Sequence, residues 1–291
     1  VTLRPKQLVL ATGLSGSKYV PAIPGAESFR GAQYHSADHT GDEEVAGRKC
    51  VVIGSNNSAH DLCVDLWEHH ADVTMIQRSP TIVVRASTMS GLSGGSPYAD
   101  PAITTDRADL INATLPYRVR TEMDKGLTQT IREIDADFYG RLEKSGFQLS
   151  HGEDGTGFFF AYFRRAAGYY IDVGASDLIA DGEVKVRSGE ISHLVPDGIE
   201  MEDGSLIPAD IIVYATGYSP MSEWIARLIS ADVEAKVGRA WGLGSGTAGD
   251  PGPWEGELRN MWKPTRQDGL WLHGGNLAQA RFHSLHLALQ I

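Results

Sequence analysis

The sequence predicts an α/β fold with two Rossmann-like domains that bind dinucleotides. Residues 49–78 contain a strand, a helix and a second strand in that order, which is the βαβ unit of a parallel sheet. Two other short apolar runs, at 7–13 and 209–217, both end in Ala-Thr-Gly. This repeated ending suggests two related nucleotide-binding sheets. A mainly helical stretch at about residues 86–168 is expected as an insertion in the second domain.

The first element is the apolar run at 7–13, which is closed by a glycine and suits a buried strand better than a helix. The Pro- and Gly-rich passage at 20–31 predicts an irregular linker. The chain opens at Val1, without a Met, only a few residues before the first strand. We therefore expect a fragment or a processed product whose first domain starts upstream.

The clearest unit is the one at 49–78, where 49–54 and 72–78 are apolar runs of strand length. Between them, 58–70 predicts a helix because its apolar side chains recur at helical spacing. These side chains are Ala59, Leu62, Cys63, Leu66 and Trp67.

Within the helical stretch, Thr105 or Asp106 is expected to cap a helix that stops before Pro116. Apolar residues at 131, 134, 138 and 142 predict a further helix that ends at Gly146. The stretch closes with aromatic residues that either line a substrate passage or fill a core, and a core is favoured for most. They are Phe158, Phe159, Phe160, Tyr162, Tyr169 and Tyr170.

Beyond this stretch, Asp-Gly pairs at 197–198 and 203–204 separate short alternating runs, a pattern typical of tight hairpins. We expect a small antiparallel meander there. A strand at 270–273 then leads through two glycines into a final helix.

Composition narrows the class of protein. The 291 residues are 42% hydrophobic and 22% charged, which is a globular composition, and the formal net charge of -11 argues against binding nucleic acid or an anionic membrane. Cys50 and Cys63 form no CxxC pair, so a reducing, cytoplasmic setting is the simplest interpretation. No apolar run is long enough to span a membrane.

The strand at 49–53 is followed by six residues that occupy the frame of a GxGxxG turn. They are Gly54, Ser55, Asn56, Asn57, Ser58 and Ala59, with Asn56 and Ala59 in place of the second and third glycines. A glycine permits the sharp turn, and the helix N-terminus offers N–H groups and a positive dipole to a pyrophosphate. Asn57 or Ser58 is expected to cap this helix. The alternative is a tight turn without a ligand.

The end of the next strand selects between the two nicotinamide cofactors. An NAD site places an acidic residue there, whereas this chain has Gln77, Arg78 and Ser79. Because an arginine suits a 2′-phosphate, NADPH is favoured over NADH. The alternative is that Arg78 is a solvated surface residue.

The segment FRGAQYHSADH at 29–39 resembles the FxGxxxHS signature of flavin-containing monooxygenases, with Phe29, Gly31, His35 and Ser36 in register. VVIGSNNSAHD and VYATGY extend the resemblance to three ordered points that cover nearly the whole chain. His39 stands where the family has an aromatic residue, and a related signature has Trp there. This disfavours a Baeyer–Villiger enzyme.

The resemblance implies a class B flavoprotein monooxygenase with FAD in one domain and NADPH in the other. In such enzymes NADPH reduces the flavin, and the resulting flavin hydroperoxide oxygenates a small organic substrate with molecular oxygen. The resemblance places His35 and Ser36 on the hinge between the domains, near the nicotinamide. No catalytic side chain is assigned, because the cofactor carries the chemistry.

The resemblance also implies the domain organisation. Residues 1–43 are the end of the FAD domain and the linker, 44–216 the NADPH domain, and 217–291 the return to the FAD domain. The family's first GxGxxG lies upstream of the strand at 7–13 and is not in this sequence, so the FAD domain is expected to be incomplete. The absent N-terminal segment is a candidate partner. Further cofactor contacts are expected from Thr12, Gly13, Thr216, Gly217, Gly275 and Asn276, although a simple glycine turn at 274–276 is about equally favoured.

Two alternatives stay open. One is another NADPH:flavin oxidoreductase on the same fold, and the other is a truncated NADPH-binding fragment without activity.

Three weaker patterns are set aside: the GxSxG at 91–95 predicts a mobile loop, and neither His69-His70 nor His283 with His286 is completed as a metal site. The loop at 241–262 is expected to pack over the flavin or the substrate.

Overall fold

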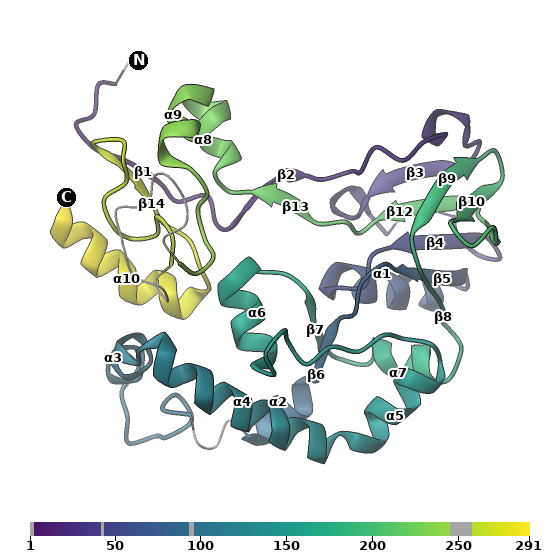
Figure 1. The fold of residues 1–291 in the computed structure, drawn as a ribbon, viewed down its shortest axis with the longest axis horizontal. Coiled ribbons are helices and arrows are strands. Elements are labelled where there is room, and N and C mark those ends of the chain that lie inside the picture. The colour runs from purple at the N-terminus through teal and green to yellow at the C-terminus, as the bar shows by residue number, and fades with distance from the viewer. Residues whose placement is uncertain (1–2, 42–43, 93–95, 245–257) are drawn as a thin grey trace.

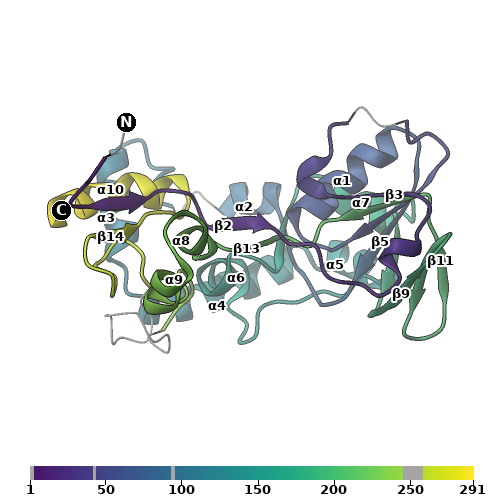
Figure 2. The ribbon, with the colours of Figure 1, turned by 90° about the horizontal axis from the view of Figure 1, so that it is seen from above.

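The computed structural model describes residues 3–41, 44–92, 96–244 and 258–291. Two α/β regions lie at opposite ends of the molecule, and a mainly helical region runs along one side (Figure 1). Strands β2 (Ser15–Lys18) and β13 (Tyr218–Pro220) pair antiparallel and bridge the two ends, as Figure 2 shows from above. The chain therefore crosses between the two α/β regions twice, side by side.

The larger sheet has five parallel strands. In order across the sheet they are β3 (Ala32–His35), β12 (Ile211–Tyr214), β4 (Lys49–Ile53), β5 (Asp72–Gln77) and β8 (Lys185–Ser188). The predicted α/β fold with a parallel sheet is confirmed. The predicted strand–helix–strand unit is also confirmed, with helix α1 (Asn57–Glu68) between β4 and β5.

Both faces of this sheet are covered, which explains why its inner strands are continuous apolar runs. Alternate residues of β4 point to opposite faces: Cys50 and Val52 belong to the core under α1, whereas Val51 and Ile53 belong to a second core. The predicted meander covers this second core and is confirmed. Its strands are β9 (Ile191–Val195), β10 (Gly198–Met201) and β11 (Leu206–Pro208).

The second α/β region is built on a two-stranded parallel pair, β1 (Leu8–Leu10) and β14 (Leu270–Leu272), so both predicted strands are confirmed. Its helices are α8 (Glu223–Leu228), α9 (Ala231–Val237) and α10 (Leu277–Gln290). The inner residues of the pair pack with two tryptophans, Trp241 and Trp262, in a third core to which α6 contributes Phe163.

In sequence, the helical region lies between β6 (Ile82–Arg85) and β7 (Tyr169–Asp172), and these two strands pair in parallel. Its helices are α2 (Ala86–Leu92), α3 (Thr105–Thr114), α4 (Tyr117–Ile134), α5 (Ala136–Lys144) and α6 (Gly157–Arg165). The remaining elements are α7 (Ala175–Ala180) and the short 3-10 turns η1 (Ala26–Ser28) and η2 (Ser36–Asp38). Within the described ranges, no helix is both long and apolar enough to cross a bilayer.

Two expectations about these helices are wrong. The cap of α3 is Thr104, whose hydroxyl accepts from the Arg107 N–H at 3.4 Å, so Thr105 and Asp106 are already helical. The single helix expected over 131–142 is two helices, because the chain leaves helical geometry at Asp135. The Asp135 carboxylate accepts a hydrogen bond from the Thr88 hydroxyl of α2 at 2.9 Å, which joins this break to α2.

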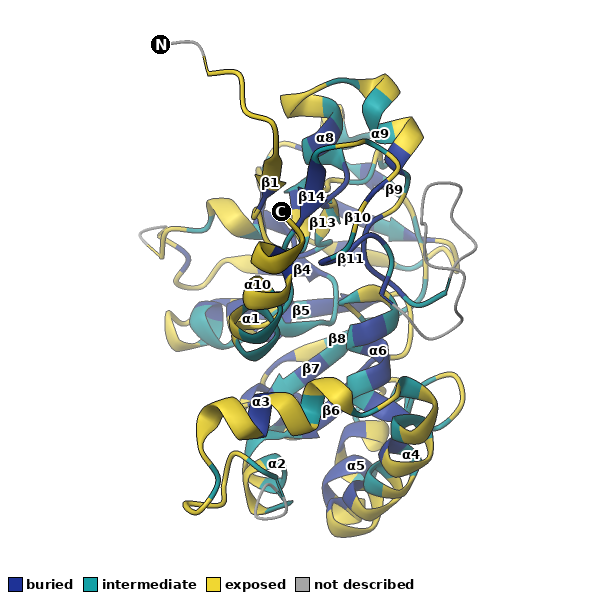
Figure 3. Ribbon diagram, turned by 90° about the vertical axis from the view of Figure 1, so that its left-hand side faces the viewer, coloured by how far each residue is buried: buried dark blue, intermediate teal, exposed yellow. Residues whose placement is uncertain are grey.

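Helices α3 and α10 are largely exposed (Figure 3), and a polar contact joins them. Arg281 on α10 donates two hydrogen bonds, of 2.6 and 2.7 Å, to the buried carboxylate of Asp109 on α3. The Tyr98 hydroxyl donates a third at 2.6 Å. The hydrogen bonds from Arg281 hold the pKa of Asp109 below its usual range.

We predict that Asp109→Ala lowers the free energy of unfolding by about 2 kcal/mol, because Arg281 and Tyr98 both lose a buried acceptor. Arg141→Ala is the matched control, since Arg141 also binds two carboxylates, those of Asp177 and Asp181, but at the exposed surface. Urea unfolding should show no change for the control. Equal effects of the two substitutions would contradict this account of the α3–α10 contact.

Candidate functional site

The carboxyl ends of three parallel strands meet at one edge of the large sheet. Tyr214 of β12 is in register with Ile53 of β4 on one side and with His35 of β3 on the other. The residues that follow these strand ends include Gly54, Ser36, Thr216 and Gly217, so the fold brings together predicted site residues from distant parts of the sequence. The strand order also reverses between β4 and β12, which is where open parallel sheets bind ligands.

Gly54 allows the chain ends after β4 and β12 to approach closely. Its φ of 133° lies in a region that side chains rarely adopt, and a Cβ atom there would be 2.4 Å from the Ala215 carbonyl oxygen. The Gly54 N–H donates to Ile76 O at 3.0 Å, and the Ala215 N–H donates to Ile53 O at 2.9 Å. The turn from β4 toward α1 is therefore fixed by backbone packing that only glycine permits.

The N-cap of α1 is Asn56, and its side chain makes no capping hydrogen bond. The expectation that Asn57 or Ser58 caps this helix is wrong. Asn57 turns its side chain toward β7, where its oxygen accepts from the Ile171 N–H at 3.0 Å, while Ser58 is exposed. The start of α1 thus keeps its positive dipole without a capping side chain from Asn56.

Residues 77–79 divide into one structural residue and two accessible ones. Gln77 is fully buried and exchanges two hydrogen bonds with the Gln148 backbone, 2.7 Å from its N–H and 2.9 Å to its carbonyl. This side chain is committed to the fold. Arg78 and Ser79 are exposed at the end of β5, beside the turn after β4. The Arg78 guanidinium is therefore accessible to a ligand that extends from the start of α1.

His35 is buried with both ring nitrogens satisfied. Its Nδ1 accepts from the Ala37 N–H at 3.1 Å, so Nε2 carries the hydrogen and donates to Gly217 O at 2.9 Å. The Thr216 hydroxyl donates to the Tyr19 carbonyl. These contacts tie the segment before β4 to the segment after β12, and they give His35 a structural role at the crossing between the two α/β regions.

A second set of predicted residues gathers at the ends of β1 and β14. The His273 N–H donates to Leu10 O at 3.0 Å, which continues the pairing, and a Cβ on Gly274 would be 2.8 Å from Gly13 O. Thr12 and Gly13 are exposed there, as is Asn276. Asn276 caps α10 in a reciprocal capping box with Gln279.

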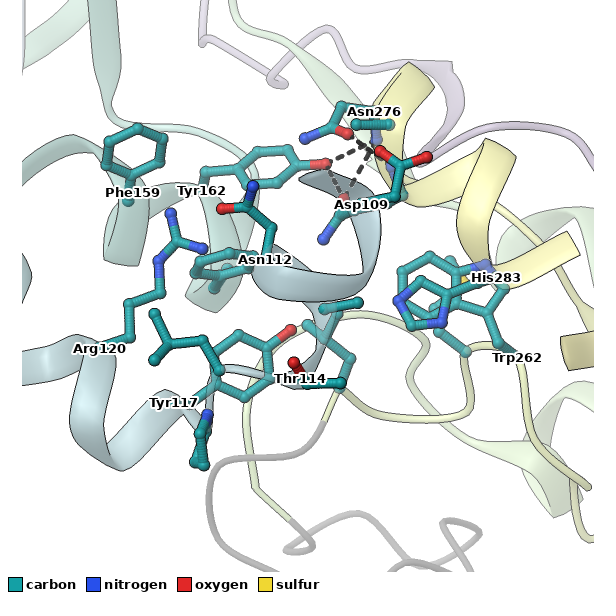
Figure 4. A pocket seen from close by; sticks show the side chains of 18 of the residues that line it. Asp109, Asn112, Thr114, Tyr117, Arg120, Phe159, Tyr162, Trp262, Asn276 and His283 are labelled. Carbon is teal, nitrogen blue, oxygen red and sulfur yellow. Dashed lines mark hydrogen bonds between the residues drawn. The ribbon is translucent and has the colours of Figure 1, made fainter. Parts of the chain in front are cut away.

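A cavity of about 710 Å³ lies beside the start of α10, between α3, α4, α6 and the chain around 258–263. Figure 4 draws 18 of the side chains around it and labels ten. The labelled side chains are Asp109, Asn112, Thr114, Tyr117, Arg120, Phe159, Tyr162, Trp262, Asn276 and His283. The Tyr162 hydroxyl accepts from the Asn276 N–H at 2.8 Å and donates to Gln279 at 2.7 Å, so α6 holds the start of α10.

The wall of this cavity combines aromatic rings with cations. The Arg120 guanidinium lies over the rings of Phe159 and Phe163, 4.9 and 5.0 Å from their centroids, and it pairs with Asp124 at 3.4 Å. Burial raises the pKa of Asp124 to about 6. Across the cavity, Trp262 stacks on His283 with centroids 4.0 Å apart.

Burial also governs the titration of two other groups in this wall. It raises the pKa of Tyr117 to about 12, and it lowers the pKa of His283 to about 4. At neutral pH both side chains are therefore uncharged. The cationic character of the wall comes from arginine and lysine side chains, namely Arg118, Arg120 and Lys263.

Several sequence predictions can be placed against this geometry. Of the six aromatic side chains predicted to fill a core or line a passage, Phe160 and Tyr170 are buried, and Phe158 and Tyr169 pack against the core under α1. Phe159 and Tyr162 line the cavity. A core role for most of these side chains is therefore confirmed. Gly91 lies in α2, while 93–95 and most of the 241–262 loop, at 245–257, fall outside the described residues. Among the residues that are described, no three His, Cys, Asp or Glu side chains gather as a metal site.

Comparison with known proteins gives one family match and many relatives. Residues 1–108 match the family model described as pyridine nucleotide-disulphide oxidoreductase. The probable indole-3-pyruvate monooxygenase YUCCA7 of Arabidopsis thaliana is 28% identical over 221 residues, which is 75% of this chain and 46% of the relative. The chain spans about half the length of the curated relatives it matches.

Solved structures show the same fold. Cyclohexanone monooxygenase from Rhodococcus sp. Phi1 bound to NADP+ superposes with a TM-score of 0.59 at 14% identity, covering 97% of this chain and 58% of that one. The complex of OTEMO with FAD and NADP gives a TM-score of 0.52 at 17% identity, covering 76% and 49%. The resemblance derived from the sequence motifs agrees with these matches.

We predict that Gly54→Ala lowers the free energy of unfolding by about 2–4 kcal/mol, because the new methyl group would meet the Ala215 backbone and the positive φ would be strained. Gly140→Ala is the control, since a Cβ there meets nothing within 4 Å and its helix should gain about 0.5–1 kcal/mol. Denaturant unfolding measures both. An unchanged free energy of unfolding for Gly54→Ala would show that the stability of the fold does not depend on the close approach of β4 and β12.

Proposed function

The chain is related to the class B flavoprotein monooxygenases, and from this premise we propose that it acts as an FAD- and NADPH-dependent monooxygenase on a small organic substrate. The observation that carries this proposal is the convergence of Gly54, the start of α1 and Arg78 at the carboxyl edge of the large sheet. The curated relatives matched by the chain are monooxygenases, and solved relatives contain FAD and NADP or NADP+.

The residues fit NADPH at this edge. The tight turn at Gly54 and the dipole of α1 would hold the pyrophosphate through backbone N–H groups of Ser55–Ser58. The exposed Arg78 guanidinium would pair with the 2′-phosphate. Gln77 would support this site indirectly, because its side chain fastens the end of β5 to Gln148. His35 would hold the crossing segment in place and is not proposed as a base.

The residues at the ends of β1 and β14 fit one side of a flavin site. Thr12, Gly13 and Gly275 offer accessible backbone, and Asn276 stands at the start of α10. Leu8 and Val9 of β1 are more than one third exposed. FAD, when bound, supplies the electron transfer and the activation of oxygen.

We propose the corresponding division of the chain. Residues 44–216 form the NADPH-binding domain with the helical region at about 86–168 inserted in it. Residues 1–43 and 217–291 contribute to the flavin domain and the crossing. In this division the cavity beside α10 receives the substrate, because it lies where the helical insertion faces the flavin side. Its aromatic wall would exclude water from the substrate.

The function is tested with the purified 291-residue chain supplied with FAD. NADPH should bleach the visible absorption of the bound flavin without oxygen, and admitting oxygen should restore it. With an acceptable substrate, oxygen consumption should exceed the release of peroxide. Bleaching without oxygen consumption would instead favour an electron-transfer reductase. Binding of NADPH without retention of flavin would favour a nucleotide-binding fragment.

We predict that Arg78→Ala lowers kcat/KM for NADPH relative to NADH by about tenfold or more, because only NADPH carries the 2′-phosphate. The control is Arg30→Ala, an exposed arginine that pairs with Asp197 at the opposite edge of the sheet. The control should leave the ratio unchanged. Where turnover is too slow to measure, the dissociation constants of the two cofactors serve as the readout. An unchanged ratio in Arg78→Ala would assign Arg78 to the solvated surface.

A further inference from the structure

His60 lies in the first turn of α1 and is fully buried. Its ring stacks on Tyr170 of β7, with centroids 3.8 Å apart and planes inclined by 8°, and meets the edge of Phe147 at 5.6 Å. Burial lowers the pKa of His60 to about 4, although the hydrogen bond to Asn56 and the charge of Asp172 oppose this shift. The ring is therefore neutral at physiological pH.

The hydrogen bonds of His60 define its tautomer. Nδ1 lies 3.0 Å from the Asn56 carbonyl oxygen, which can only accept, so Nδ1 carries the hydrogen. Nε2 is buried and has no hydrogen-bond partner. The same Asn56 oxygen also accepts from the backbone N–H groups of Ala59 at 3.0 Å and His60 at 3.1 Å. Three donors thus converge on the carbonyl of the residue that caps α1.

This convergence determines which way the next peptide N–H points. In a trans peptide the C=O and the following N–H point in opposite directions. Fixing the Asn56 carbonyl toward the helix therefore directs the Asn57 N–H outward from the N-terminus. The Asn57 side chain is held as well, by the Ile171 N–H at 3.0 Å. Both restraints come through β7, since Tyr170 supports the His60 ring from the same strand.

Resting on the proposed function, we infer that His60 is a positioning residue for the pyrophosphate of NADPH: its Nδ1–H group orients the Asn56–Asn57 peptide so that the Asn57 N–H faces the cofactor. This role of His60 accounts for a turn that binds a pyrophosphate although Asn56 and Ala59 replace the second and third glycines of the GxGxxG frame. It also accounts for a histidine in an aromatic site where its second nitrogen has no partner. Phenylalanine would stack on Tyr170 equally well and leave no polar atom unsatisfied.

The test compares two ligands of the 291-residue chain. NADP+ has the pyrophosphate, whereas adenosine 2′-monophosphate carries only the 2′-phosphate end that Arg78 is proposed to bind. His60→Phe keeps the aromatic stack but removes the donor. Its Kd for NADP+ should rise by about fivefold to tenfold, while its Kd for adenosine 2′-monophosphate stays within twofold, on the order of experimental scatter. Its Tm should be unchanged or higher, because a buried unpaired nitrogen is removed.

Two further variants separate positioning from stability. Tyr139→Phe deletes another buried hydrogen bond of the same core, from the Tyr139 hydroxyl to Val83 O at 2.9 Å, and should lower Tm without changing either Kd. His60→Gln keeps an N–H donor four residues after Asn56 and should retain NADP+ affinity even if Tm falls. This variant supplies the test should His60→Phe not fold.

An unchanged NADP+ Kd in folded His60→Phe would overturn the inference and leave the proposed function standing. Equal weakening of both ligands would also overturn it, since that result indicates general distortion of the sheet edge. A wild-type chain that does not bind NADP+ would refute the nucleotide site itself, and the role of His60 with it.

Discussion

The close approach of β4 and β12 is the constraint on which the rest of the structure depends. Their carboxyl ends can lie this close only because Gly54 has no side chain to meet the Ala215 backbone. That contact places the start of α1 beside the crossing segments and sets where the turn toward α1 begins. Through the His35 bond to Gly217, it also fixes the point at which both crossing strands leave the large sheet.

Polar contacts and a shared apolar core together hold the helical region against the second α/β region. The bonds from Arg281 to Asp109 join α10 to α3, and the Tyr162 hydroxyl joins α6 to the start of α10. Such contacts depend on geometry more strictly than apolar packing does, because each buried carboxylate or hydroxyl needs its partner. The spacing of the cavity walls is therefore set by these hydrogen bonds together with the apolar cluster that includes Phe163, Trp241 and Met261.

The sequence predicted those parts of the fold that are governed by local apolar patterns. The strands at 49–53, 72–77 and 211–214, helix α1 and the meander follow from runs and periodicities within single segments. It could not predict that the Gln77 side chain is buried and joins the end of β5 to the Gln148 backbone, because Gln148 is distant in sequence. His60 was missed for the same reason: only the folded chain brings Tyr170 against it. The cap of α3 depends on one side-chain hydrogen bond, and the break at Asp135 on the backbone angles of a single residue; periodicity registers neither.

The proposed nucleotide turn and the proposed substrate cavity share one continuous stretch of chain. Helix α6 carries Phe159 and Tyr162 to the cavity and leads, after a few residues, into β7. β7 in turn supports the start of α1 through Tyr170 and the Ile171 N–H. A displacement of α6 by a ligand in the cavity would therefore act on the turn through covalent connection and direct packing, without any intermediate domain. The aromatic character of 158–170 serves both ends of this stretch, because rings that shape the cavity at one end pack behind the nucleotide turn at the other.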